Sequence, residues 1–194
     1  MQAIHRSAVT LVIGGARSGK TRYAQQLGER VENVVFVATA HAGDEEMCTK
    51  ITRHRKERPQ HWHTVEESLD LGGTIERYGS GADLIVIDCL TLFAANLLAA
   101  TEDFPADKSE PEIARHIDYL CRALRATPCS VVLVSNEVGS GVVPAYPLGR
   151  RYRELLGEIN QKTAQLADEV VLMVAGLPLS LKSAPKAIAA EIRL

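Results

Sequence analysis

Short apolar runs alternate with longer segments of mixed polarity along the chain. The apolar runs are rich in branched residues and stop at glycine or at a polar residue, as buried parallel strands do. They cover residues 8–13, 34–38, 84–88, 131–134 and 169–175. Strands separated by helical segments are typical of an α/β fold. The pattern therefore predicts a mostly parallel sheet with helices packed on its faces.

Between the strands, apolar residues recur at helical spacing and predict the intervening helices. The expected helices cover 22–30, 47–58, 92–100, a segment marked by Ile113, Ile117, Leu120 and Leu124, and 148–166. Pro59 should end the second of these helices by about Arg58, because proline lacks the N–H that continues a helix. Acidic residues and prolines predict that 101–111 is an exposed loop. No repeat or linker is present, so 1–194 is expected to form one domain.

The first apolar run ends in a glycine-rich loop, and a helix-like pattern follows it. The loop consists of Gly14, Gly15, Ala16, Arg17, Ser18, Gly19, Lys20 and Thr21. The G-x-x-x-x-G-K-[ST] spacing between a strand and a helix identifies a phosphate-binding P-loop. Its backbone N–H groups can surround a phosphate, while Lys20 reaches the β- and γ-phosphates and Thr21 binds Mg²⁺. A plain turn between strand and helix is the weaker interpretation, because motif and context agree.

The third apolar run ends in an aspartate, Asp88, downstream of the P-loop. This is the pattern of a Walker B strand, which we expect to lie next to the P-loop strand. A carboxylate at the carboxyl end of such a strand can hold Mg²⁺ directly or through water. The alternative is that Asp88 only caps the helix that starts near Thr91. The metal role is the preferred interpretation.

The expected helix 47–58 carries a dense run of charges. The run comprises Arg53, His54, Arg55, Lys56, Glu57 and Arg58. On composition alone, a solvated charged helix is the favoured explanation. His61 and His63 follow closely, but their spacing fits neither an i, i+4 ligand pair nor a cysteine–histidine pattern. A metal site is therefore not expected at these two histidines.

Overall charge and cysteine usage narrow the class of protein. The formal net charge is −2 with 24% charged residues, so no basic field is available to hold nucleic acid. The four cysteines show no C-x-x-C spacing, which favours reduced thiols over a zinc site, and Cys89 and Cys121 are expected in the core. No apolar run reaches the roughly 20 residues of a membrane span, and residues 1–10 lack a signal-peptide apolar region. A cytoplasmic protein is expected.

Three blocks of residues together resemble one enzyme family. They are Gly14–Thr21, then 53–59 with Trp62, and then Asn136, Glu137, Val138 and Gly139 with Gly141 and Pro144. In order and spacing they resemble the bifunctional adenosylcobinamide kinase and adenosylcobinamide-phosphate guanylyltransferase of cobalamin biosynthesis. The resemblance runs from about Val9 to Lys182. Thr21 stands where the family usually has serine, and it keeps the hydroxyl.

The resemblance implies a fold, an assembly and two reactions. The fold is a three-layer, RecA-like P-loop NTPase domain with a mostly parallel central sheet and helices on both faces, and members assemble as homotrimers. ATP or GTP phosphorylates the hydroxyl of adenosylcobinamide. Transfer of GMP from GTP to adenosylcobinamide phosphate then gives adenosylcobinamide-GDP and pyrophosphate. Mg²⁺ is the implied cofactor.

The resemblance also assigns residues by position. The second reaction is held to pass through a guanylylated histidine, which corresponds to His54, with Lys20 as the other catalytic residue. The implied nucleotide contacts are Gly14 to Thr21, Ala38, Thr39, Ala40, Arg55, Lys56, Glu57, Arg58, Glu66 and Asp88, and the implied Mg²⁺ ligands are Thr21 and Asp88. Neutral imidazole can attack the α-phosphorus, and the neighbouring cations can offset charge on the triphosphate.

Two other interpretations remain open from sequence. One is a single-activity P-loop kinase, in which Asp88 or Glu137 orients the acceptor hydroxyl and His54 is an ordinary surface residue. The other is a nucleotide-gated switch whose loops order around the γ-phosphate. Guanylylation of a histidine would separate the first from the bifunctional enzyme, and turnover with cobinamide would exclude the second.

Overall fold

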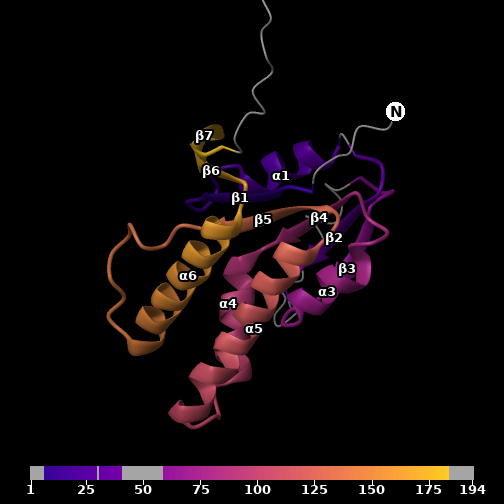
Figure 1. The fold of residues 1–194 in the computed structure, drawn as a ribbon. Helices are drawn as coiled ribbons and strands as arrows, with labels where there is room; N and C mark the ends of the chain where they lie inside the picture. The colour runs from indigo at the N-terminus through magenta and orange to yellow at the C-terminus, as the bar shows by residue number, and fades with distance from the viewer. Residues whose placement is uncertain (1–6, 30, 41–58, 184–194) are drawn as a thin grey trace, which may run out of the picture.

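The computed structural model describes residues 7–29, 31–40 and 59–183 (Figure 1). The expected helix 47–58, with His54 and its neighbouring cations, lies outside the described residues. No helix in the described part of the chain combines the length and apolar character that a membrane span requires.

Seven strands form one sheet in the order β3-β2-β4-β5-β1-β6-β7. Their bounds are β1 Val9–Gly14, β2 Val34–Ala38, β3 His63–Glu66, β4 Leu84–Asp88, β5 Ser130–Asn136, β6 Glu169–Val174 and β7 Leu177–Lys182. All neighbouring pairs are parallel except β6 and β7, which are antiparallel. The five predicted strands are therefore confirmed, and the mostly parallel sheet with them.

The prediction that the Walker B strand lies next to the P-loop strand was wrong. The Walker B strand β4 does not pair with β1, because β5 lies between them and pairs with both. The hydrophobic pattern identifies a buried strand, but it carries no information about which strand lies beside it. The carboxyl ends of the strands still meet at one edge: Asp88 is level with Ala38 and Val134, and Gly14 is level with Asn136.

Helices cover both faces of the sheet and give three layers. Their bounds are α1 Lys20–Gly28, α3 Leu71–Tyr78, α4 Leu90–Ala100, α5 Ala106–Ala126 and α6 Pro147–Leu166. Figure 1 shows α1 on one face and the other four on the opposite face. The apolar core is divided in the same way, since Ala24 of α1 packs with Val12 and Phe36, whereas Leu11 packs with residues of α3 to α6. This is the RecA-like P-loop architecture that the resemblance implied.

The helix α5 begins earlier than the sequence predicted. The expected loop 101–111 was wrong in its second half, because α5 starts at Ala106 and contains Pro111. Ile113 and Ile117 of this helix are fully enclosed in the core. Their burial outweighs the loss of one helical hydrogen bond at the proline.

Three elements were not predicted. β3 has only four residues and the first turn of α3 contains Gly72 and Gly73, so neither has a clear periodic pattern. Gly72 of α3 lies against the Tyr119 ring of α5, and a Cβ there would lie 2.8 Å from the ring. The last predicted strand is followed by β7, because Ala175 (φ 51°) and Gly176 (φ 84°) reverse the chain.

Candidate nucleotide site

The P-loop connects β1 to α1 in a conformation that depends on its glycines. Gly19 has φ of +95°, a left-handed conformation that favours glycine. A Cβ at Gly14 would collide with the carbonyl oxygen of Met173 on the neighbouring strand. The turn after β6 also holds the loop, since the Gly176 N–H donates to the Ser18 carbonyl at 3.0 Å. The loop therefore has a fixed backbone between the sheet and α1.

The amino terminus of α1 is open to an anion. Gly19 is its N-cap, and no side chain among the described residues caps it. The first N–H groups of a helix have no partner within the helix, and the helix dipole gives this end a partial positive charge. The Tyr23 N–H already donates to the Gly19 carbonyl at 3.0 Å, so the open donors are those before Tyr23. A phosphate at this position would meet backbone donors and a favourable field.

Lys20 contributes a full positive charge to the site. Its side chain is 8% exposed, and its ammonium donates to the Gly15 carbonyl at 2.5 Å and to Ser18 Oγ at 3.3 Å. Burial lowers the pKa of Lys20, while the neighbouring Cys89 and Asp88 oppose the shift. Both of these hydrogen-bond partners are neutral oxygens within the loop. A bound phosphate would therefore give this ammonium an anionic partner in a partly desolvated place.

Thr21 and Asp88 meet at the carboxyl end of the sheet. Thr21 Oγ1, in the first turn of α1, donates to Asp88 Oδ2 at 3.0 Å, although β5 separates β4 from the P-loop strand β1. The N-cap residue of α4 is Cys89, the residue after Asp88, and it makes no side-chain capping bond. A hydroxyl and a carboxylate are hard oxygen ligands that suit Mg²⁺.

The rest of a metal shell would have to come from outside this pair. The described residues contain no group of three or more histidine, cysteine or acidic side chains that could hold an ion. Mg²⁺ in phosphate-handling sites is ordinarily bound by one or two protein oxygens together with substrate phosphates and water. The Thr21 and Asp88 pair fits that mode, and does not fit a site built by protein alone.

Thr39 holds the backbone that follows Asp88. Its side chain is 0% exposed, and its hydroxyl accepts from the Cys89 N–H at 2.7 Å and donates to the Cys89 carbonyl at 2.8 Å. The Thr39 N–H donates to the Asp88 carbonyl at 3.2 Å, and Asn96 Nδ2 donates to the Thr39 carbonyl at 2.9 Å. The Thr39 hydroxyl is thus occupied by backbone contacts, so it fixes the backbone next to the Asp88 carboxylate.

A Thr39→Val variant tests this role. Valine keeps the shape but leaves the Cys89 backbone N–H and carbonyl without the hydroxyl, which should cost about 1–3 kcal/mol in the free energy of unfolding. Urea denaturation measures the loss. Thr39→Ser retains the hydroxyl and serves as the control. Equal stability of the valine variant and the wild type would contradict the importance of these bonds.

A second polar network holds the end of β5 beside the P-loop. Ser135 Oγ donates to Asn160 Oδ1 at 2.6 Å, and Asn160 Nδ2 donates to the Asn136 carbonyl at 3.0 Å. The Asn136 N–H donates to Thr91 Oγ1 at 3.0 Å, and the Glu137 N–H donates to the Gly14 carbonyl at 3.0 Å. Sequence reasoning did not identify Asn160. Its signal was a polar residue beside Ile159 on the buried face of a helix.

The remaining predicted residues divide into two groups. Ala38, Ala40 and Glu66 lie with Thr39 at the same edge as the P-loop, where Glu66 ends the edge strand β3 level with Ala38. Glu66 is exposed, whereas its neighbour Glu67 accepts from the N–H groups of Leu69 and Asp70. His54, Arg55, Lys56, Glu57 and Arg58 lie outside the described residues.

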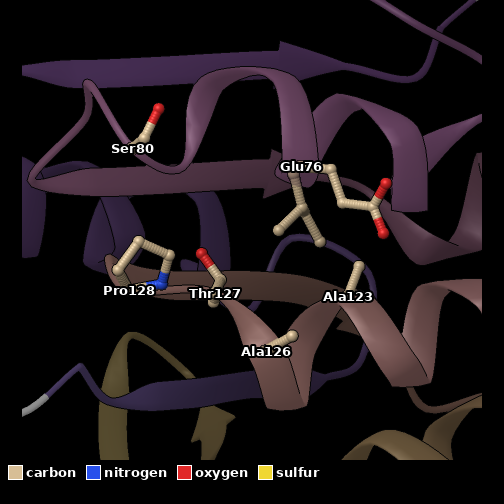
Figure 2. A pocket seen from close by; sticks show the side chains of 7 residues that line it. Glu76, Ser80, Ala123, Ala126, Thr127 and Pro128 are labelled. Carbon is tan, nitrogen blue, oxygen red and sulfur yellow. The ribbon is translucent and has the colours of Figure 1, made fainter.

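A hollow between α3 and α5 lies at the opposite end of the sheet. Figure 2 shows its lining, with Ser80, Thr127 and Pro128 at the ends of helices that lead into β4 and β5. Parallel sheets bind ligands outside the carboxyl ends of their strands, and this hollow is at the amino ends. It is not a candidate for the nucleotide site.

The three-layer fold, the P-loop and the Thr21–Asp88 contact define a P-loop nucleotide-binding protein. A solved ATPase from the type III secretion system of pathogenic bacteria has the same kind of fold, with a TM-score of 0.58 and 11% sequence identity. The superposition covers 90% of this chain and 57% of the ATPase, and at this identity it supports the fold alone.

Sequence comparison assigns the family. Residues 10–181 match the family described as cobinamide kinase / cobinamide phosphate guanyltransferase. The bifunctional adenosylcobalamin biosynthesis protein CobP of Pseudomonas aeruginosa is 41% identical over 176 residues, covering 90% of this chain and 98% of the relative. The CobU proteins of Escherichia coli and Salmonella typhimurium, which carry the same description, are 38% and 39% identical, each over 89% of this chain and 98% of the relative. The chain belongs to this family and is a bifunctional kinase and guanylyltransferase.

Proposed function

We propose that this enzyme phosphorylates the hydroxyl of adenosylcobinamide with ATP or GTP and then transfers GMP from GTP to the resulting phosphate. The products of the second step are adenosylcobinamide-GDP and pyrophosphate. The observation that carries the proposal is the Thr21–Asp88 contact of 3.0 Å beside the P-loop, in a chain of this family. It supports a nucleotide site at the carboxyl edge of the sheet.

In the kinase step, the acceptor oxygen attacks the γ-phosphorus and the bond to the β-phosphate oxygen breaks. The P-loop N–H groups and Lys20 hold the triphosphate and stabilise charge as it moves to the leaving diphosphate. Mg²⁺, held by Thr21 and Asp88 directly or through water, would neutralise the phosphate oxygens when bound. Within the described residues, the nucleotide contacts proposed are the P-loop, Ala38 to Ala40, Glu66 and Asp88.

In the guanylyl step, a neutral His54 nitrogen attacks the α-phosphorus of GTP and pyrophosphate leaves. The phosphate oxygen of the acceptor then attacks the same phosphorus and regenerates the imidazole. Arg55, Lys56 and Arg58, which are adjacent in sequence, would favour departure of pyrophosphate and lower the pKa of the imidazole, with Glu57 in the same segment. A covalent intermediate divides one transfer into two easier ones.

Turnover with defined substrates tests the proposal. The purified enzyme is incubated with adenosylcobinamide, MgCl₂ and GTP, and the corrinoid products are identified by mass. We expect adenosylcobinamide phosphate first and adenosylcobinamide-GDP later, with one pyrophosphate released for each GMP transferred. Formation of the phosphate alone, with no GDP conjugate after prolonged incubation, would support a single-activity kinase instead.

An Asp88→Asn variant tests the metal role. The amide keeps an oxygen that Thr21 can donate to, but it removes the negative charge that attracts Mg²⁺. Turnover at limiting Mg²⁺ should fall by about 10- to 100-fold with little change in the midpoint of unfolding. The Mg²⁺ titration of activity measures the effect. An unchanged Mg²⁺ dependence would show that Asp88 does not serve the metal.

We further propose that the enzyme acts in the cytoplasm as a homotrimer. The family resemblance supports the assembly, and the composition, which offers no basic field for nucleic acid, supports a protein whose partners are small molecules and copies of itself. Analytical ultracentrifugation measures the assembly state, and a monomer at micromolar concentration would contradict the trimer.

A further inference from the structure

A cluster of apolar side chains projects into solvent between β5 and α6. Val142 is 95% exposed, Val143 57%, Tyr146 63% and Leu148 60%. These four residues, here called the apolar loop patch, lie within seven positions of one another in the chain. Single exposed apolar residues are common on protein surfaces, but a cluster of this kind marks a place where something binds.

The loop that carries the patch is held in a definite shape. Glu137 Oε1 accepts from the Gly139 N–H at 2.5 Å and from the Ser140 N–H at 3.2 Å, and Arg153 Nη2 donates to the Gly139 carbonyl. Arg150 Nη1 donates to the Pro144 carbonyl at 3.1 Å and to the Ala145 carbonyl at 2.7 Å. Side chains at both ends therefore fix the backbone. The exposed apolar residues are therefore carried by a loop with a defined backbone conformation.

The end of the loop next to α6 is held by close packing. Gly149 has no Cβ, and one added there would lie 2.7 Å from the Tyr146 ring and 2.8 Å from Pro144 Cβ. The ring of Tyr146 therefore rests against the backbone of the first turn of α6. Tyr146 keeps 63% of its surface exposed despite this contact.

The loop starts at the P-loop itself. The Glu137 N–H donates to the Gly14 carbonyl at 3.0 Å, and Val142 follows about five residues later. Five residues span at most about 18 Å even when fully extended. Val142, at the near end of the patch, therefore lies within this distance of Glu137, at the carboxyl edge of the sheet that carries the P-loop, while Tyr146 and Leu148 follow further along the loop at the start of α6.

We infer that the apolar loop patch binds the corrinoid acceptor and positions it toward the nucleotide. This inference rests on the proposed function. The acceptor hydroxyl must reach the γ-phosphate, so the body of the acceptor must lie against surface that borders the P-loop. A corrinoid is a broad macrocycle with much apolar surface and polar amide side chains. The patch supplies apolar contact, and the guanidinium groups of Arg150 and Arg153 lie behind the same loop.

A Val142→Ser/Val143→Ser double variant tests the assignment. Both side chains are mainly exposed, so their replacement should leave folding intact. Equilibrium dialysis, with the visible absorbance of adenosylcobinamide as the signal, measures the Kd for the acceptor, and steady-state kinetics measures the KM for the nucleotide. Loss of contact by the two valines should raise the acceptor Kd about tenfold or more and leave the nucleotide KM unchanged.

Leu181→Ser is the matched control. Leu181 is 58% exposed on β7, near the residues that pair with the start of β6, and so at the end of the sheet away from the P-loop. This variant should bind the acceptor like the wild type. Sedimentation of all three proteins is measured at the dialysis concentration, and we expect the same assembly state in each.

Three results would count against the inference. An unchanged acceptor Kd in the double variant overturns it. A changed assembly state in the double variant, with or without weaker binding, assigns the patch to contact between subunits and also overturns it. Failure of the wild type to bind or phosphorylate adenosylcobinamide overturns the proposed function itself. This failure is distinguished from failure of the inference because it occurs in the protein without substitutions.

Discussion

An enzyme with Lys20→Ala is expected to lose kinase and guanylyltransferase activity together, each by about 100- to 1000-fold. The Lys20 ammonium is 8% exposed and lies inside the P-loop, where it supplies a full positive charge that backbone donors cannot replace. Both reactions need a bound and neutralised triphosphate. The kinase is assayed with adenosylcobinamide, and guanylyl transfer is assayed with adenosylcobinamide phosphate supplied separately, so each rate is measured alone.

Lys162→Ala is the control for this substitution. Lys162 is a partly exposed residue of α6 that pairs with Glu158 and Asp118, away from the P-loop, and its loss should leave both rates near the wild-type values. Circular dichroism verifies that the Lys20 variant remains folded. If that variant kept near-normal guanylyl transfer, a second nucleotide site would have to exist, and the single-site account would be wrong.

The second large effect is expected at His54. His54→Ala should lose all guanylyl transfer, because alanine has no nitrogen to attack the α-phosphorus. Phosphoryl transfer to the corrinoid hydroxyl needs no covalent histidine, so the kinase should persist at least in part. Parallel assays of the two activities measure this split. It distinguishes a nucleophile from a residue that only helps to bind the nucleotide.

His61→Ala and His63→Ala are the matched controls for His54. Both histidines lie a few residues downstream and are exposed. Each control variant should retain guanylyl transfer. Equal loss of both activities in a folded His54 variant would make His54 a binding residue, and loss of transfer in either control alone would move the assignment to that position.

Sequence reasoning located the buried strands because they are continuous apolar runs. Leu84–Asp88 is one example, and its boundaries agree with the structure. The order of strands could not be predicted in the same way, since β5 separates β4 from β1 through contacts between segments far apart in the chain. The Thr21–Asp88 contact nevertheless forms, because Asp88 ends β4 and Thr21 lies in the first turn of α1, which starts at the same carboxyl edge of the sheet.

Elements stabilised by close approach were harder to predict. The first turn of α3 contains two glycines, which disfavour helix, yet Gly72 lets the helix pack directly on Tyr119. Its one local signal was Asp70, whose side chain accepts from the Gly73 N–H at 3.0 Å as a helix cap. Pro111 had the opposite effect, because it predicted a loop where the structure has a helix. Burial of the residues after it keeps it within α5.

The site shows a similar division. The P-loop has a sequence motif whose spacing follows from phosphate binding, and the structure places it between β1 and α1. The Thr39 hydroxyl bonds to the backbone of Cys89, a structural role that the sequence did not indicate. Hydrogen bonds of this kind, between a side chain and the backbone that follows another strand, leave no periodic pattern in the sequence. The Cys89 side chain itself is neutral at pH 7, because burial and the Asp88 carboxylate raise the pKa of its thiol to about 11.

A chase of the labelled enzyme tests the two-step guanylyl transfer most directly. The enzyme is incubated with Mg²⁺ and GTP labelled at the α-phosphate, freed of nucleotide, and mixed with adenosylcobinamide phosphate. The account predicts acid-labile, base-stable label on His54, which then moves one for one into adenosylcobinamide-GDP. Label that never appears on the protein, or that stays there while adenosylcobinamide-GDP forms from added GTP, would contradict it.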